Sequence, residues 1–241
     1  MSLSPLAQKI IDAHGSVDRW QKFDQVSARL HQGGALWAIK GHDGTLTDTT
    51  VTVGLRSEWA SHAPFGTSEK LSHFEPARVE IATTSGDTLE RLQSPRASFS
   101  GHRFDTPWSE LQLAYFAGYA MWTYLNLPFA LALPGVGTEQ LDDWQENGET
   151  WQRLRIIFPD SIATHSRIQT IYVDEAGLLK RHDYDVDIAA GTPAAHYIGD
   201  YTEVQGIQFP RRHRIFPRQP DGQSSSDPLV VSIDVSEIKL T

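Results

Sequence analysis

Between residues 164 and 216 the sequence reads as a run of short strand-like segments separated by turn signals. Residues 178–188 show the pattern most clearly, because His182, Tyr184 and the apolar residues alternate with charged ones. A period of two residues is typical of antiparallel strands with one buried face. Three further strand candidates share this region, at residues 168–173, 195–203 and 207–216. The pattern predicts a β-meander and leaves little room for helix.

The rest of the chain extends this prediction to a mainly β fold. Two segments favour helix: residues 5–14, which follow an N-terminal Ser-Pro signal, and the aromatic segment 108–127. No change of composition marks a linker. We therefore expect a single domain over residues 1–241, an antiparallel and incompletely closed β-barrel with an N-terminal helix and a helical insertion at about 107–137.

Two segments are harder to assign. Residues 26–38 alternate weakly around Gly33-Gly34, which predicts one strand with a bend at the glycines. Pro134, Gly135 and Gly137 follow the aromatic segment, so a loop is predicted there before strand structure returns at residue 149.

Composition narrows the classes of function. The 241 residues carry a formal net charge of −9, which disfavours a nucleic-acid partner, because phosphate contacts need clustered Lys and Arg. The chain has no cysteine, which excludes disulfides, thiolate metal sites and thiol catalysis. Residues 1–20 lack a basic start followed by an apolar run, so we expect a cytoplasmic protein without a secretion signal. The apolar stretch 111–133 is interrupted by Gly, Asn and Pro, so no transmembrane segment is expected.

Polar residues recur on the faces predicted to point inward. His182 and Tyr184 share one face, and His213 lies with apolar residues on another strand. Loss of solvation on burial lowers the pKa of an imidazole. These three residues are candidate catalytic groups for acid–base chemistry, although Tyr and His also fill barrel walls as ordinary hydrogen-bonded residues. His182, His196 and His213 suggest a metal site only weakly, since the neighbouring aspartates point to the other face; no metal and no cofactor are expected.

The segment 108–127 is unusually rich in aromatic residues. Such a helix can plug the barrel as core, or it can be a lid over an apolar pocket. If it is a lid, the expected ligand-binding residues come from this helix and from the inward-facing strand positions: Trp108, Tyr115, Phe116, Tyr119, Trp122, His182, Tyr184, His196 and His213.

Two parts of the chain resemble a known family. Residues 11–20 followed by 26–29 resemble the amino-terminal helix of the LolA/LolB-like lipoprotein-carrier superfamily. Residues 169–181 and 201–210 are similar to the strand-turn-strand signature of that superfamily. The resemblance implies an unclosed antiparallel barrel with helices over its mouth and an acyl-binding cavity. The sequence departs from the family in having no lipidation cysteine and no visible signal peptide.

Three functional hypotheses remain open. The first is a soluble carrier that binds a lipid or another hydrophobic small molecule in an apolar cavity. The second is an enzyme of the same fold that uses inward His and Tyr residues on an apolar small molecule. The third is a structural interaction module, which requires a filled barrel without a pocket.

Overall fold

A computed structural model describes residues 3–241 of the chain. The helices are α1 (Pro5–His14), α2 (Val17–Trp20), α3 (Ala35–Ile39) and α4 (Glu110–Asn126), with short 3₁₀ turns at η1 (Pro95–Phe99), η2 (Phe129–Ala132) and η3 (Asp187–Ala189). The strands of the first half are β1 (Gln25–Gly33), β2 (Asp48–Gly54), β3 (Ala60–Ala63), β4 (Lys70–Glu75), β5 (Arg78–Thr83) and β6 (Thr88–Gln93). Those of the second half are β7 (Gly137–Glu146), β8 (Glu149–Ile157), β9 (Ile168–Val173), β10 (Leu179–Val186), β11 (Thr192–Val204), β12 (Ile207–Pro217) and β13 (Val231–Leu240).

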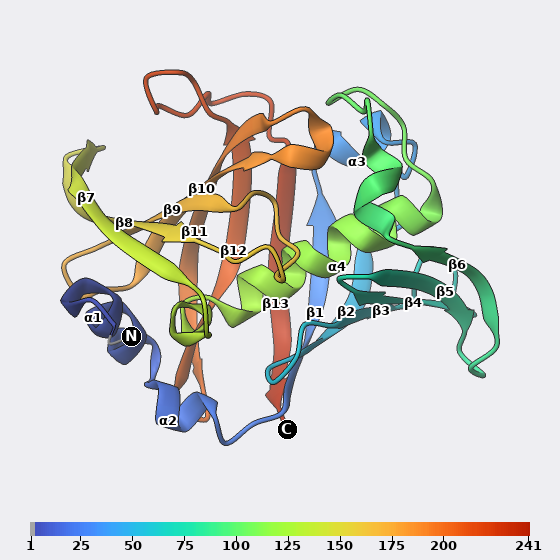
Figure 1. Ribbon diagram of the computed structural model, residues 1–241, viewed down its shortest axis with the longest axis horizontal. Coiled ribbons are helices and arrows are strands. Elements are labelled where there is room, and N and C mark those ends of the chain that lie inside the picture. The colour runs from blue at the N-terminus through green and yellow to red at the C-terminus, as the bar shows by residue number, and fades with distance from the viewer. Residues whose placement is uncertain (1–2) are drawn as a thin grey trace.

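All thirteen strands belong to one antiparallel sheet, which bends around α4 (Figure 1). The strand order is β6-β5-β4-β3-β2-β1-β13-β12-β11-β10-β9-β8-β7, so β6 and β7 are edges that do not pair with each other. The two halves meet where β1 pairs with β13, and β13 pairs in turn with β12 over four residue pairs between 212–215 and 231–234. The predicted fold class is confirmed: the sheet is an incompletely closed barrel with an N-terminal helix and a helical insertion.

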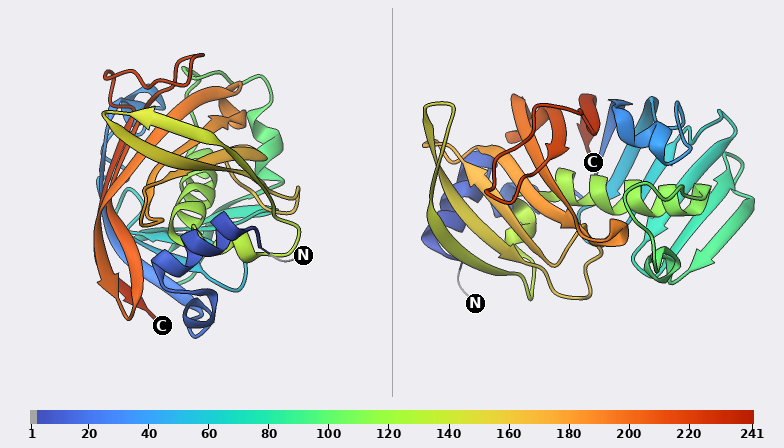
Figure 2. Two further views of the ribbon diagram at one scale, coloured as in Figure 1. Left: turned by 90° about the vertical axis from the view of Figure 1, so that its left-hand side faces the viewer. Right: turned by 90° about the horizontal axis from the view of Figure 1, so that it is seen from above.

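Helix α4 lies inside the curve of the sheet in both views of Figure 2. A capping box starts the helix, in which Ser109 accepts from the backbone N–H of Gln112 and the Gln112 side chain accepts from that of Ser109. Every residue from 112 to 126 is buried, so the helix has no solvent face. Of the two interpretations of the aromatic segment, the helix that plugs the barrel is the one observed, and a lid exposed on its outer side is not.

Two local predictions are wrong. The strand expected over residues 26–38 ends at Gly33, and α3 follows it, because Gly34 has a φ of 107° that turns the chain out of the sheet. The loop expected before residue 149 contains β7, an edge strand whose ten residues are all exposed or half-buried. A strand that buries neither face has no alternation to reveal it.

Among residues 3–241, no helix has both the length and the hydropathy that crossing a lipid bilayer requires. Residues 1–2 of the predicted domain 1–241 lie outside the described residues. That residues 1–241 form a single domain stays a prediction.

The packing of α4 on β4 is so close that only glycine fits at position 118. A Cβ atom there would overlap the Cβ and the ring of Phe74. We expect Gly118→Ala to lower the free energy of unfolding by roughly 1–3 kcal/mol, because overpacking outweighs the gain in helix propensity. Urea unfolding monitored by tryptophan fluorescence measures the change.

Gly199→Ala is the matched control. Position 199 lies in β11, and a Cβ there would meet no atom within 4 Å. This change should leave stability within about 1 kcal/mol of the wild type. If Gly118→Ala were instead more stable than the wild type, α4 would not be pressed against β4.

Candidate functional site

A cavity of about 330 Å³ lies between α4 and the strands β10 to β13, and α3 closes one side of it. Helix α4 contributes Phe116, Ala117, Ala120, Met121 and Tyr124, which follow each other at helical spacing. The two alanines leave the space that larger side chains would fill. The strands and loops supply the opposite wall, mainly through Val186, Ala189, Ala194, Ile215, Phe216, Pro217, Pro228, Val230, Val231 and Ile233.

Almost none of the cavity surface comes from polar atoms. At its inner end the Tyr124 hydroxyl lies 2.5 Å from the Tyr184 hydroxyl and 2.9 Å from Nε2 of His165. The His165 and Tyr184 rings stack in parallel, with their centroids 3.9 Å apart. The Tyr184 hydroxyl and His165 Nε2 thus share the Tyr124 hydroxyl as a partner, and the cavity meets the faces of these rings.

Lys40 also borders the cavity, but its ammonium group bonds to a neighbouring loop. Its Nζ donates to the carbonyl oxygens of Arg103 (3.3 Å), Phe104 (2.5 Å) and Thr106 (3.1 Å). It lies 4.4 Å from the centroid of the Trp108 ring. Burial lowers the pKa of Lys40 to about 8, against the influence of nearby Asp105. All three N–H groups of the ammonium are therefore engaged by the 103–106 loop.

A second group of buried imidazoles lies beside this inner end. Nε2 of His182 is 2.6 Å from Oε1 of Gln169, and Nε2 of His196 is 2.8 Å from Nδ1 of His213. Burial lowers the pKa of His182 to about 3 and that of His213 to about 4, so both rings are neutral at pH 7. The predicted inward orientation of His182, Tyr184 and His213 is confirmed, because all three rings pack against Tyr124 of α4.

The ring centroid of His196 lies 6.0 Å from that of His182 and 5.0 Å from that of His213. Within residues 3–241, no three His, Cys, Asp or Glu side chains are arranged to hold a metal ion.

The structure separates the predicted ligand-binding residues into two groups. Trp108, Phe116 and Tyr184 border the cavity. The others are buried elsewhere: Tyr115, Tyr119, Trp122, His182, His196 and His213. Helical rotation explains the split on α4, because Tyr115 and Trp122 face the other half of the sheet. The Tyr115 ring packs against Phe74, and Nε1 of Trp122 donates to the Gly54 carbonyl at 2.9 Å.

Sequence reasoning missed several cavity residues. Tyr124 was detectable, because Phe116, Ala120 and Tyr124 recur at intervals of four and so share one face of α4. His165 and Lys40 lie outside the regular elements, between β8 and β9 and just after α3, where no periodicity indicates which way a side chain points.

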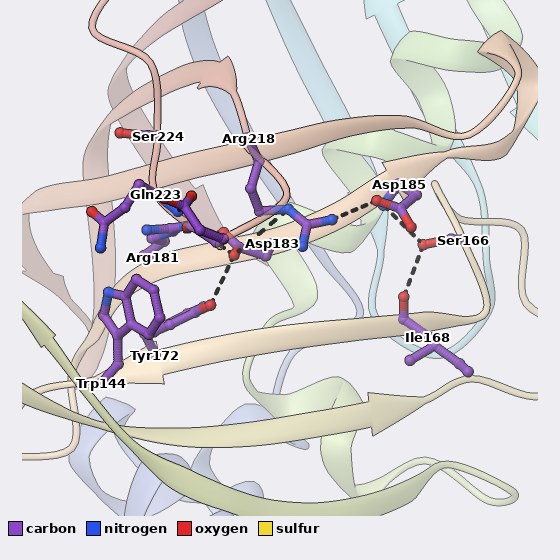
Figure 3. Close-up of polar contacts among 12 residues, drawn as sticks. Trp144, Ser166, Ile168, Tyr172, Arg181, Asp183, Asp185, Arg218, Gln223 and Ser224 are labelled. Carbon is purple, nitrogen blue, oxygen red and sulfur yellow. Dashed lines mark hydrogen bonds and ion pairs between the residues drawn. The ribbon is translucent and has the colours of Figure 1, made fainter.

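The outer face of β10 carries a cluster of charges (Figure 3). Arg181, Asp183 and Asp185 point away from α4, as the alternation predicts, yet the Arg181 side chain is 0% exposed. Arg181 pairs with Asp183 Oδ1 at 2.6 Å and with Glu146 Oε2 at 2.8 Å. The rings of Trp144, Tyr172 and Tyr197 surround its guanidinium group.

This cluster anchors the loop 218–228 that follows β12. Arg181 Nη2 donates to the Gly222 carbonyl at 2.5 Å, and the Tyr197 hydroxyl is 2.7 Å from Ser224 Oγ. Arg218, at the start of the loop, pairs with Asp185 at 2.5 Å. Because Pro217 and Pro228 at the two ends of this loop border the cavity, the outer charge cluster holds part of its wall in place.

The arrangement of the sheet and of α4 matches solved structures over nearly the whole chain. A LolA superfamily protein from Nitrosomonas europaea aligns with a TM-score of 0.54 at 12% identity, covering 100% of this chain and 94% of that chain. The fold is LolA-like. A putative outer membrane lipoprotein-sorting protein domain from Vibrio parahaemolyticus aligns equally well, with a TM-score of 0.54, 10% identity, and coverage of 98% of this chain and 91% of that chain.

The LolA-like fold corrects one expectation. A cytoplasmic location was predicted from residues 1–20, and it is contradicted by the similarity to an outer membrane lipoprotein-sorting domain. The prediction used residues 1–20 alone, whereas the similarity in fold extends over nearly the whole chain. No protein-family model and no curated protein matches the sequence.

The buried imidazoles of this LolA-like fold should make it sensitive to acid. Burial lowers the pKa of six histidines, so the unfolded state binds more protons below pH 6.5 and the free energy of unfolding falls as the pH is lowered. For each histidine whose pKa lies near 3 or 4, the loss at pH 5 is at most about 2 kcal/mol. The buried carboxyl group of Glu58, whose pKa burial raises to about 8, acts in the opposite direction. The six histidines whose pKa is lowered by burial are His14, His62, His165, His182, His196 and His213.

Urea unfolding at pH 7, 6 and 5 measures this slope. His182→Gln should reduce the proton uptake on unfolding by about one proton, whereas His31→Gln, on an exposed position of β1, should not change it. Stability that rises steadily from pH 7 to pH 5 would show that the imidazoles are not buried as described.

The outer cluster should contribute to stability through its buried charges. Arg181→Gln leaves Asp183 and Glu146 buried without their partner, and we expect it to cost about 3–5 kcal/mol. The exposed pair of Arg211 and Asp200, at 2.8 Å, provides the control, because Arg211→Gln should cost about 0–1 kcal/mol. Equal effects of the two changes in urea unfolding at pH 7 would contradict the burial of Arg181.

Proposed function

We propose that the protein binds or carries a lipid or another hydrophobic small molecule, whose apolar part occupies the cavity beside α4. The single observation that supports this most directly is the apolar wall of that cavity. Burial of hydrocarbon against such a wall contributes about 25 cal/mol per Å². A volume of about 330 Å³ lies within the range of small-molecule sites, roughly 300–1,000 Å³.

The LolA-like fold supports the same proposal. One matched structure is described as a putative outer membrane lipoprotein-sorting protein domain, and this description agrees with a hydrophobic cargo. The interaction-module hypothesis requires a filled interior, which the cavity does not provide.

The enzyme hypothesis fits the described contacts less well. A general acid or base has to reach the ligand, whereas the Tyr184 hydroxyl and His165 Nε2 are both within hydrogen-bonding distance of the Tyr124 hydroxyl at the end of the cavity. His182, His196 and His213 do not border the cavity. For the described residues, the geometry favours a site that holds a molecule over one that transforms it.

Ala120→Leu tests the proposal by filling the cavity. The larger side chain displaces about three methylene groups of ligand, so the affinity for an environment-sensitive apolar dye should fall by roughly 50-fold. Stability should be kept or raised, because the added atoms occupy empty space. Dye titration, corrected for the folded fraction, measures the affinity.

Trp122→Phe is the matched control on the same helix. Trp122 is buried but does not border the cavity, and this change removes its hydrogen bond to Gly54. Stability should fall by roughly 1–3 kcal/mol while dye affinity per folded molecule stays the same. If Ala120→Leu left the affinity unchanged, the dye would bind elsewhere and the proposal would fail.

A further inference from the structure

The size of the cavity limits what it can hold. An apolar cavity of about 150 Å³ accommodates one benzene molecule, with six carbon atoms. By the same proportion, 330 Å³ has room for roughly twelve carbon atoms. Two or three long acyl chains therefore do not fit together in this space.

The shape of the cavity favours a chain over a compact ring system. Twenty-five residues border only about 330 Å³, so the wall is extensive for the volume that it encloses. They come from α3, α4, five strands and the loops between them. The cavity reaches from the buried ring of Tyr184 to the exposed residues Pro193 and Pro228. A cavity that extends from a buried ring to exposed residues suits an extended hydrocarbon.

The surface of the cavity offers a polar head almost no partner, because nearly all of it comes from apolar atoms. Lys40 directs its three N–H groups to backbone carbonyls, and the Tyr184 hydroxyl and His165 Nε2 both bond to the Tyr124 hydroxyl. Gln32 Nε2, Trp108 Nε1 and His165 Nδ1 have no hydrogen-bond partner among the described residues, but these atoms are themselves buried. A carboxylate or phosphate in this space would lose its hydration without compensation. The head must therefore stay at the exposed end.

The charged residues beside the exposed end of the cavity favour no particular charge on the polar head of the ligand. Arg218 follows the bordering residue Pro217, and its guanidinium group is already paired with Asp185. Asp227 precedes Pro228 on the other side. Opposite charges near one opening favour neither an anionic nor a neutral head.

We propose that the ligand of this cavity is a single-chain amphiphile, which inserts one hydrocarbon chain of about twelve carbon atoms and leaves its polar head outside. This inference rests on the proposed binding function and adds to it the number of chains, the length of the buried segment and the indifference to the head.

A series of n-alkyl alcohols and n-alkyl carboxylates with 8 to 16 carbon atoms tests it, by displacement of the apolar dye below the concentration at which micelles form. Affinity should rise roughly fourfold per methylene group and level off near twelve carbons. Alcohols and carboxylates of equal length should bind within about threefold of each other, since the head makes no buried contact. In Ala120→Leu the plateau should move to chains about three carbons shorter, and in Trp122→Phe it should stay.

The outcomes separate the two proposals. If neither the dye nor any chain binds, the proposed function is overturned. If chains bind but affinity keeps rising to sixteen carbons, or depends strongly on the head, the binding function stands and the single-chain inference is overturned. Tighter binding of a rigid polycyclic hydrocarbon than of any chain in the series would also overturn the inference.

Discussion

The burial of α4 against the concave face of the sheet is the contact on which the rest of the structure depends. A sheet that bends but does not close has a wide apolar face to cover, and one helix covers it without a solvent face of its own. Close approach at Gly118 brings the helix against β4. On the other side of the helix, Ala117 and Ala120 are too small to reach β11 to β13, and the cavity is the space that they leave.

Strand β10 keeps two kinds of polar chemistry apart. Its inner face carries neutral groups, His182 and Tyr184, whose tips pair with other uncharged side chains. Its outer face carries Arg181 and Asp183, which neutralise each other under the 218–228 loop. A shift of the register by one residue would place the ions beside the cavity, at a large cost in solvation. The alternation along β10 therefore protects the apolar character of the cavity.

Much of this was predictable from local pattern. The alternation along β10 and β12 assigned the inner and outer faces correctly, and the run of aromatic residues located α4 to within two residues at its start. Local pattern did not predict the exposed edge strand β7, because a strand that buries neither face shows no alternation of apolar and polar residues. It also failed to divide the aromatic residues of α4 between cavity and core, because a helix buried on all sides has no polar face to orient it. Lys40 and His165 owe their places to tertiary contacts that no short window of sequence contains.

The short pairing of β12 with β13 lies in the wall of the cavity. Four residue pairs join these two strands, and Ile215, Val231 and Ile233 from them border the cavity. Helix α4 packs mainly on β2 to β5, none of which borders the cavity. Across the cavity, Tyr124 connects it to the second half through Tyr184 and His165. A guest that enlarges the cavity would therefore press on the wall formed by β10 to β13, and the packing of α4 on β2 to β5 would stay as it is.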